Sequence, residues 1–109
     1  MDAIVQAKRV LEIFKEMSQI PRGSGNEKGI SDYIVNFAHN LGLEATQDSE
    51  WNVVIKKPAT PGYENRPAVI LQGHIDMVCV KGHDSSHDFT KDPIANIIEG
   101  EWMHADDTT

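Results

Sequence analysis

The segment Ala68-Val69-Ile70-Leu71-Gln72-Gly73-His74-Ile75-Asp76-Met77 decides how this sequence is interpreted. Its first four residues form an uninterrupted apolar run, which is typical of a strand covered on both faces. Because side chains alternate along a strand, His74 and Asp76 are predicted to point to the same side at the strand's end. Ligands in α/β folds gather at the carboxyl ends of strands. The segment therefore predicts a buried strand that leads into a candidate site.

The spacing of His74 and Asp76 suits a metal ligand and the carboxylate that orients it. A histidine can bind a metal through one ring nitrogen while a nearby carboxylate holds the other nitrogen, which fixes the tautomer and raises the basicity of the ligand. Zinc is the usual metal for imidazole with carboxylates in a hydrolase. Two residues at this spacing are a weak signal by themselves, and a structural histidine is the alternative interpretation.

Two amphipathic helices precede this segment. Apolar residues recur along one face of Ala3–Met17, which predicts the first helix, and Pro21–Gly25 ends it. Ser24 and Glu27 have the spacing of a capping box at the start of a second helix. The apolar positions of this second helix are Ile30, Tyr33, Ile34, Phe37, Ala38 and Leu41. Gly42 follows where a left-handed residue commonly ends a helix.

The remaining elements are predicted to be short strands. Leu43–Asp48 and Asn52–Lys57 flank a short turn, and a proline-rich loop follows up to Pro67. Asn96–Ile98 and Trp102–His104 predict a second hairpin. Helices mixed with strands, at least one strand being fully buried, predict an α/β layer architecture. The first helix and the central strand need more coverage than 109 residues readily supply, so the chain is expected to be part of a larger domain.

Composition narrows the class of protein. Apolar residues make up 39% and charged residues 25% of the 109 residues, as in soluble globular proteins. The formal net charge of −7 argues against a nucleic-acid partner, because phosphate binding needs a basic face. No apolar run is long enough to span a bilayer, and the first residues lack the features of a signal peptide. We therefore expect a cytoplasmic protein with no membrane partner.

The single cysteine, Cys79, excludes an internal disulfide within this sequence. Paired with His74 or His83 it could form a nucleophile and base, but no third orienting group is evident. A buried, inert thiol is the expectation for Cys79.

The other histidines leave a further hypothesis open. His39 falls on the second helix and is expected to be exposed. His83, His87 and His104 lie near acidic residues in predicted loops or strand ends. A stand-alone metal sensor could use His74, His83 and His87 together with the acidic tail. Another alternative is a non-catalytic binding or self-association module that buries its apolar surface against a partner.

Five ordered stretches resemble the aminoacyl-histidine dipeptidases. This family belongs to the zinc aminopeptidase and carboxypeptidase superfamily that also includes carnosinases and aminoacylase. The resemblance covers nearly the whole chain. The stretches that carry it are Ile20–Glu27, Asn52–Asn65, Leu71–Val78, His87–Ile94 and Glu99–Trp102.

The resemblance implies a fold and a set of site residues. It implies that residues 1–109 are the N-terminal part of a three-layer α/β/α catalytic domain with a mixed sheet, without the separate dimerisation or lid domain. By this likeness His74 matches the first zinc ligand, and Asp76 matches the aspartate of the catalytic centre that orients it. The family's other ligands and its glutamate base come later in its sequence. One departure is Asp107, where the family has a glycine that often serves a backbone conformation unsuited to other residues.

The resemblance also implies a function. It implies a fragment of a dinuclear-metal dipeptidase that hydrolyses Xaa-His and other dipeptides, with two zinc ions in the complete active site, or manganese or cobalt in their place. The isolated chain is expected to be inactive and to bind no metal tightly, because a zinc site needs at least three protein ligands. The expected partners are a dipeptide substrate and, through exposed apolar surface, further copies of the chain.

Overall fold

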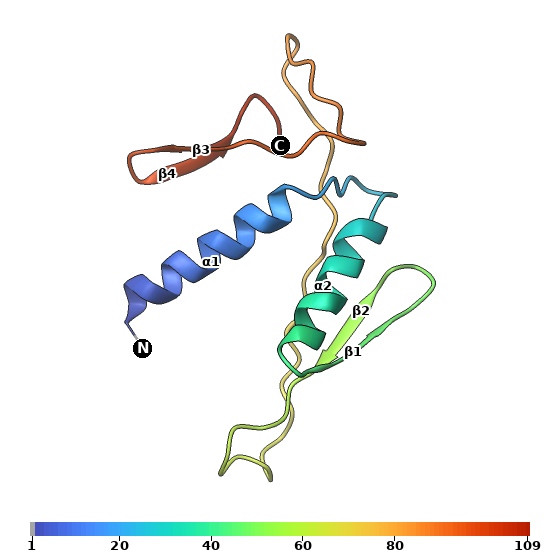
Figure 1. The fold of residues 1–109 in the computed structure, drawn as a ribbon, viewed down its shortest axis with the longest axis vertical. Coiled ribbons are helices and arrows are strands. Elements are labelled where there is room, and N and C mark those ends of the chain that lie inside the picture. The colour runs from blue at the N-terminus through green and yellow to red at the C-terminus, as the bar shows by residue number, and fades with distance from the viewer. Residues whose placement is uncertain (1) are drawn as a thin grey trace. The chain divides into compact units, whose positions relative to one another are not determined.

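The structure, a computed structural model, describes residues 2–109 (Figure 1). Its elements are α1 (Ala3–Ser18), α2 (Lys28–Asn40), β1 (Glu44–Gln47), β2 (Val53–Lys56), β3 (Asn96–Glu99) and β4 (Trp102–Ala105). These elements fall into two compact units. The first unit comprises the residues up to Ile30 together with Asp76–Thr109, and the second unit comprises Ser31–Ile75.

Helix α1 begins directly after Asp2, which caps it. The side chain of Asp2 accepts a hydrogen bond from the Ile4 N–H at 3.0 Å, which satisfies one of the orphan donors of the first turn. The helix ends one residue later than predicted, at Ser18, which is buried and donates its hydroxyl to the Phe14 carbonyl at 2.8 Å. The predicted helix is confirmed. Its apolar face is largely open to solvent, since Val10 is 65% exposed.

The β3–β4 hairpin lies in the same unit as α1. Its strands pair antiparallel from Asn96↔Ala105 to the turn, where Gly100 has a φ of 61° that favours glycine. The chain leading into β3 is fixed to the end of α1, because the Ile94 N–H donates to the Ser18 carbonyl at 2.9 Å. This hairpin was predicted from the sequence and is confirmed.

The second unit holds most of α2 and the β1–β2 hairpin. Gly42 adopts the predicted left-handed conformation with a φ of 72°, and the chain turns back so that the Leu43 N–H donates to the Ala38 carbonyl. The two strands joined by a short turn were predicted, and they pair antiparallel with Glu44 opposite Lys56. Gln47 then ties the hairpin to α2 by donating to the buried Ser31 hydroxyl at 2.7 Å.

The β1–β2 turn is organised by one carboxylate. Asp48 accepts from the backbone N–H groups of Glu50 and Asn52 at 2.9 Å each, and from the Asn52 side-chain amide at 2.8 Å. These donors, the Asn52 side chain foremost, hold the pKa of the Asp48 carboxyl below its usual value. Trp51 takes a φ of 67° within this turn.

The predicted strand at Ala68–Leu71 is wrong for this chain. The segment has no strand partner among residues 2–109, because β1 with β2 and β3 with β4 each pair only with one another. Without a neighbouring strand it is not covered either. Val69, Ile70 and Leu71 are 82%, 89% and 93% exposed, where a strand covered on both faces was expected.

The predicted capping box is also wrong. Helix α2 begins at Lys28, so Ser24 lies too far from its first turn to cap it. The carboxylate of Glu27 instead accepts from the Gly25 N–H at 2.6 Å within the preceding turn. The Ser24 hydroxyl is engaged elsewhere, as described below.

The core of the described chain is small. Among residues 2–109, the only buried apolar side chains are Ile30 and Ala38. The predicted α/β class is confirmed, since helices combine with small antiparallel sheets. The three-layer arrangement and the assignment of residues 1–109 to one catalytic domain stay predictions. Neither helix in the described part of the chain has the length and apolar character to cross a membrane.

Candidate functional site

Asp76, one of the two predicted site residues, is held by a residue far away in the sequence. Its side chain is partly buried, and its Oδ2 accepts a hydrogen bond from the Ser24 hydroxyl at 2.5 Å. The same hydroxyl lies 3.4 Å from the Met77 carbonyl oxygen. Sequence reasoning missed this role of Ser24. The available signal was that Ser24 and Asp76 both belong to stretches that carry the family resemblance.

Backbone pairing brings Ser24 to Asp76. The Met77 N–H donates to the Arg22 carbonyl at 2.8 Å, and the Ser24 N–H donates to the Met77 carbonyl at 3.2 Å, which makes a short parallel bridge centred on Gly23 and Met77. Gly23 also lies close to the side chain of Cys79. A β-carbon at Gly23 would come within 2.5 Å of the Cys79 sulfur.

His74, the other predicted site residue, is exposed. It belongs to the end of the second unit, whereas Asp76 begins the second segment of the first unit. No strand is assigned to either residue. That the two side chains point to the same side therefore stays a prediction.

A cavity of about 360 Å³ lies within the first unit. Apolar side chains form most of its wall, including Leu11 and Phe14 of α1 and Met103 of β4, and Arg22 and His104 lie on its margin. The Nε of Arg22 is buried, and no residue among 2–109 accepts a hydrogen bond from it. Burial also lowers the pKa of the Arg22 guanidinium.

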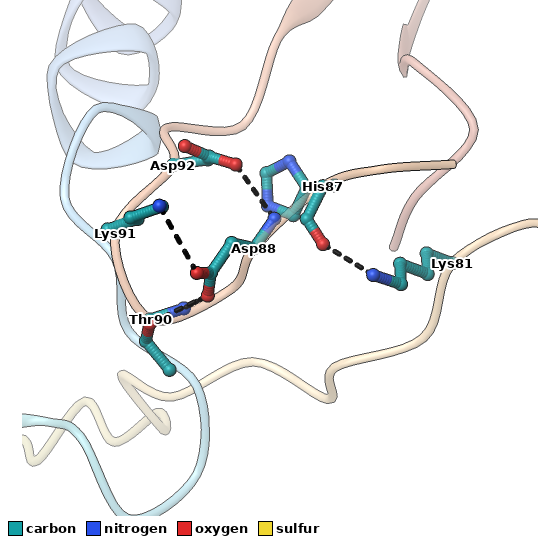
Figure 2. A network of polar contacts seen from close by, with 6 residues as sticks. All are labelled: Lys81, His87, Asp88, Thr90, Lys91 and Asp92. Carbon is teal, nitrogen blue, oxygen red and sulfur yellow. Dashed lines mark hydrogen bonds and ion pairs between the residues drawn. The ribbon is translucent and has the colours of Figure 1, made fainter.

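The loop rich in histidine and aspartate uses its carboxylates to build turns (Figure 2). Asp88 accepts from the Thr90 hydroxyl at 2.6 Å and from the Thr90 N–H at 3.0 Å, and Lys91 lies 3.7 Å away. These contacts, the Thr90 hydroxyl foremost, lower the pKa of the Asp88 carboxyl. Asp92 accepts from the Asp88 N–H at 2.7 Å. The acidic side chains here are thus engaged within the loop.

The histidines of this region are placed separately. His87 is partly buried and packs edge-on against Phe89, with ring centroids 4.5 Å apart. His104 is 3.5 Å from Glu99 across the β3–β4 hairpin. His83 is exposed. His39 on α2 is also exposed, as was predicted for it.

The donors that a metal needs are incomplete in this chain. Within residues 2–109, no three His, Cys, Asp or Glu side chains lie close enough together to hold a metal ion. His74 and Asp76 are of the donor types that zinc accepts, and they can supply one ligand and its orienting carboxylate. They fit part of a zinc centre and do not form one by themselves. This finding gives no support to a stand-alone metal sensor.

Cys79 differs from its expectation. It is exposed, whereas a buried thiol was predicted. The segment that holds it, Val78–Val80, is exposed throughout. Its sulfur lies 3.8 Å from the Met77 carbonyl oxygen, within the same segment.

The last residues pair back onto the segment that follows Asp76. Lys81 and Thr108 form an antiparallel bridge, and the Thr109 N–H donates to the Val80 carbonyl at 2.8 Å. Asp107, where the resemblance implies a glycine, has a φ of 55°. The left-handed conformation that favours glycine is therefore present at this position, occupied by an aspartate.

Comparison with known proteins identifies the class of this chain. It is 47% identical over 98 residues to the cytosol non-specific dipeptidase of Escherichia coli K12, a match that covers 90% of this chain and 20% of that protein. The crystal structure of aminoacylhistidine dipeptidase from Vibrio alginolyticus matches with a TM-score of 0.82 and 47% identity over 87% of this chain and 19% of that chain. Over most of its length the chain is similar to one segment of these dipeptidases.

The chain spans about a fifth of the length of both relatives. A more distant match, 27% identical over 75 residues, is to a Pyrococcus furiosus protein named as a candidate LysW-lysine/LysW-ornithine hydrolase. No protein-family model matches the sequence. The resemblance inferred from the five stretches is confirmed.

Proposed function

We propose that this chain contributes His74 and Asp76 to the active site of a dinuclear-zinc dipeptidase that hydrolyses Xaa-His and other dipeptides. The observation that carries the proposal is the 47% identity to a dipeptidase over 98 residues. A match of that length in a chain of 109 residues takes in residues 74–76. The names of the relatives indicate the substrate class, a dipeptide, for the complete enzyme.

His74 would hold the metal through one ring nitrogen, and Asp76 would accept a hydrogen bond from the other. That contact keeps the imidazole in one tautomer and makes it a stronger ligand. When bound, two metal ions supply an activated water and polarise the carbonyl of the scissile bond. Zinc is the metal we propose, with manganese or cobalt as alternatives, because imidazole with carboxylates suits zinc in hydrolases.

The isolated chain is expected to be inactive. One imidazole cannot fix the geometry of a zinc centre that needs at least three protein ligands. We therefore expect tight metal binding and hydrolysis only when the other four fifths of a dipeptidase are present. The cytoplasm is the proposed location, since the Escherichia coli relative is named as a cytosol enzyme.

A chimera tests this function directly. Residues 1–109 would replace the matched segment of the Escherichia coli cytosol non-specific dipeptidase, and hydrolysis of a series of dipeptides would be measured. The chimera should be active, while the isolated chain should not. His74→Ala should abolish the activity of the chimera, and His39→Ala, at an exposed histidine of α2, should retain it. Equal activity of the two variants would overturn the proposal.

A second candidate function is self-association. It is favoured by the exposure of three consecutive apolar side chains, Val69–Leu71, and of the apolar face of α1. An apolar stretch without a strand partner can pair with another copy of the chain. Sedimentation of the isolated chain at several concentrations distinguishes a monomer from such an oligomer.

A further inference from the structure

Ser24 makes an unusually close contact with Asp76. The hydroxyl oxygen lies 2.5 Å from Oδ2, although the two residues are 52 positions apart. A neutral O–H···O hydrogen bond usually spans about 2.7–2.8 Å. Distances of about 2.5–2.7 Å are typical when the acceptor is ionised. The Ser24 hydroxyl is the donor in this contact, and the Asp76 side chain is the acceptor.

The position of Ser24 is fixed by its backbone. Its N–H donates to the Met77 carbonyl, and the neighbouring Arg22 carbonyl accepts from the Met77 N–H at 2.8 Å. Gly23, between them, is buried, and a β-carbon there would displace the side chain of Cys79. The hydroxyl of Ser24 is therefore presented to Asp76 by two hydrogen bonds and a close approach of the two segments.

The hydroxyl of Ser24 has no role in the turn or the helix that directly follow it. Helix α2 begins at Lys28, so Ser24 does not serve as its cap. The turn at Gly25 is closed by the carboxylate of Glu27, which accepts the Gly25 N–H. What Ser24 contributes through its hydroxyl is the contact with Asp76 and the longer one with the Met77 carbonyl.

We propose that Ser24 is a positioning residue of the dipeptidase, which holds the Asp76 carboxylate in the orientation needed to support His74. This inference rests on the proposed function of His74 and Asp76. A hydrogen bond to one carboxylate oxygen restricts rotation of that group, so it fixes where the carboxylate points. Ser24 acts through Asp76 and has no contact with substrate in this account.

The test compares serine variants in the chimera. Ser24→Ala removes the hydroxyl, and Ser49→Ala, at an exposed serine in the β1–β2 turn, is the matched control. Loss of a partner of this kind typically reduces metal affinity or activity by about 10-fold to 100-fold. We expect Ser24→Ala to weaken zinc affinity, measured by competition with a chelator, and to lower kcat by about tenfold, with a smaller change in KM. Ser49→Ala should match the parent chimera in both.

A second pair of variants separates the hydroxyl from the shape of the side chain. Threonine and valine have nearly the same form, and threonine alone can donate a hydrogen bond. Ser24→Thr should therefore retain zinc affinity and kcat, whereas Ser24→Val should lose them as Ser24→Ala does. This pair decides the question even if the alanine variant fails to fold. Equal behaviour of the threonine and valine variants would overturn the proposal.

The result can be told apart from failure of the proposed function. Asp76→Asn in the same chimera tests whether Asp76 itself matters for zinc affinity and kcat. If Asp76→Asn has no effect, the proposed function of Asp76 is wrong. If Asp76→Asn lowers both quantities and Ser24→Ala lowers neither, only the role of Ser24 is wrong.

Discussion

The carboxylate of Asp107 lies against Gly82, in the space that a side chain at position 82 would need. The two residues are also joined through the backbone, because the Gly82 N–H donates to the Asp107 carbonyl at 2.8 Å. Asp107 has a φ of 55° there. A β-carbon at position 82 would displace the Asp107 carboxylate, and Asp107 itself holds a conformation that disfavours a β-carbon.

Substitutions at this pair should change stability in opposite directions. Gly82→Ala should lower the free energy of unfolding of the chimera by about 1–3 kcal/mol, because the Asp107 carboxylate must move. Asp107→Gly should raise it by about 1 kcal/mol, because the left-handed conformation strains a residue with a β-carbon. Urea unfolding measures both. The control is Asp106→Gly at the neighbouring residue, which should lower the same quantity by about 0.5–1 kcal/mol. Equal effects of the two glycine variants would contradict the strain argument.

The Asp48 turn should respond to acid. Hydrogen bonds lower the pKa of the folded-state carboxyl, so the unfolded chain binds more protons and the turn's contribution is present above the unfolded pKa of about 3.9. That contribution should be lost as the pH falls through the folded pKa, in a window below about pH 4. Carbon-13 NMR of the Asp48 carboxyl should give a midpoint that rises in Asn52→Ala. An unchanged midpoint in that variant would show that Asn52 is not the main cause.

Arg22 should be replaceable by an apolar residue with a gain in stability. Its Nε is buried, and no residue in the described part of the chain accepts a hydrogen bond from it. A buried donor without an acceptor lowers the free energy of unfolding by about 1–3 kcal/mol. Arg22→Met keeps the length of the side chain beside an apolar cavity, so we expect the thermal midpoint of the isolated chain to rise. Arg66→Met, at an exposed arginine of the proline-rich loop, should change stability by less than about 0.5 kcal/mol. A lower midpoint for Arg22→Met would indicate that its guanidinium stabilises the fold.

The apolar stretch Val69–Leu71 should drive association of the isolated chain. Ile70 is 89% exposed and lies between two further exposed apolar residues in the sequence, whereas Ile98 is the one exposed apolar residue of β3. Ile70→Lys should reduce the concentration dependence of the sedimentation coefficient, and Ile98→Lys should change it little. Equal reduction by both would point to a different interface.

Local sequence patterns were sufficient to predict the helices and hairpins, whose backbone hydrogen bonds join residues close together in the sequence. Both helices and both hairpins were predicted, because apolar spacing and turn residues such as Gly42 and Gly100 act within a few positions. The predicted strand at residues 68–71 failed for a related reason. A strand needs a neighbour, and its apolar composition says nothing about whether that neighbour lies within the same 109 residues.

Only part of the candidate site could be predicted from the sequence. His74 and Asp76 were found from their spacing and from the family resemblance. Ser24 was assigned to a helix cap, because its distance from Glu27 along the chain matched a capping box. The contact with Asp76 depends on a parallel bridge between segments more than 50 residues apart, and no local pattern encodes that bridge.

The zinc content of the chimera tests the central claim most directly. Mass spectrometry of the metal would be done on the chimera and on its His74→Ala variant after dialysis against metal-free buffer. We expect two zinc ions per chain in the chimera, and loss of at least one in His74→Ala, while His39→Ala keeps both. Full zinc content in His74→Ala would contradict the proposal that His74 is a metal ligand.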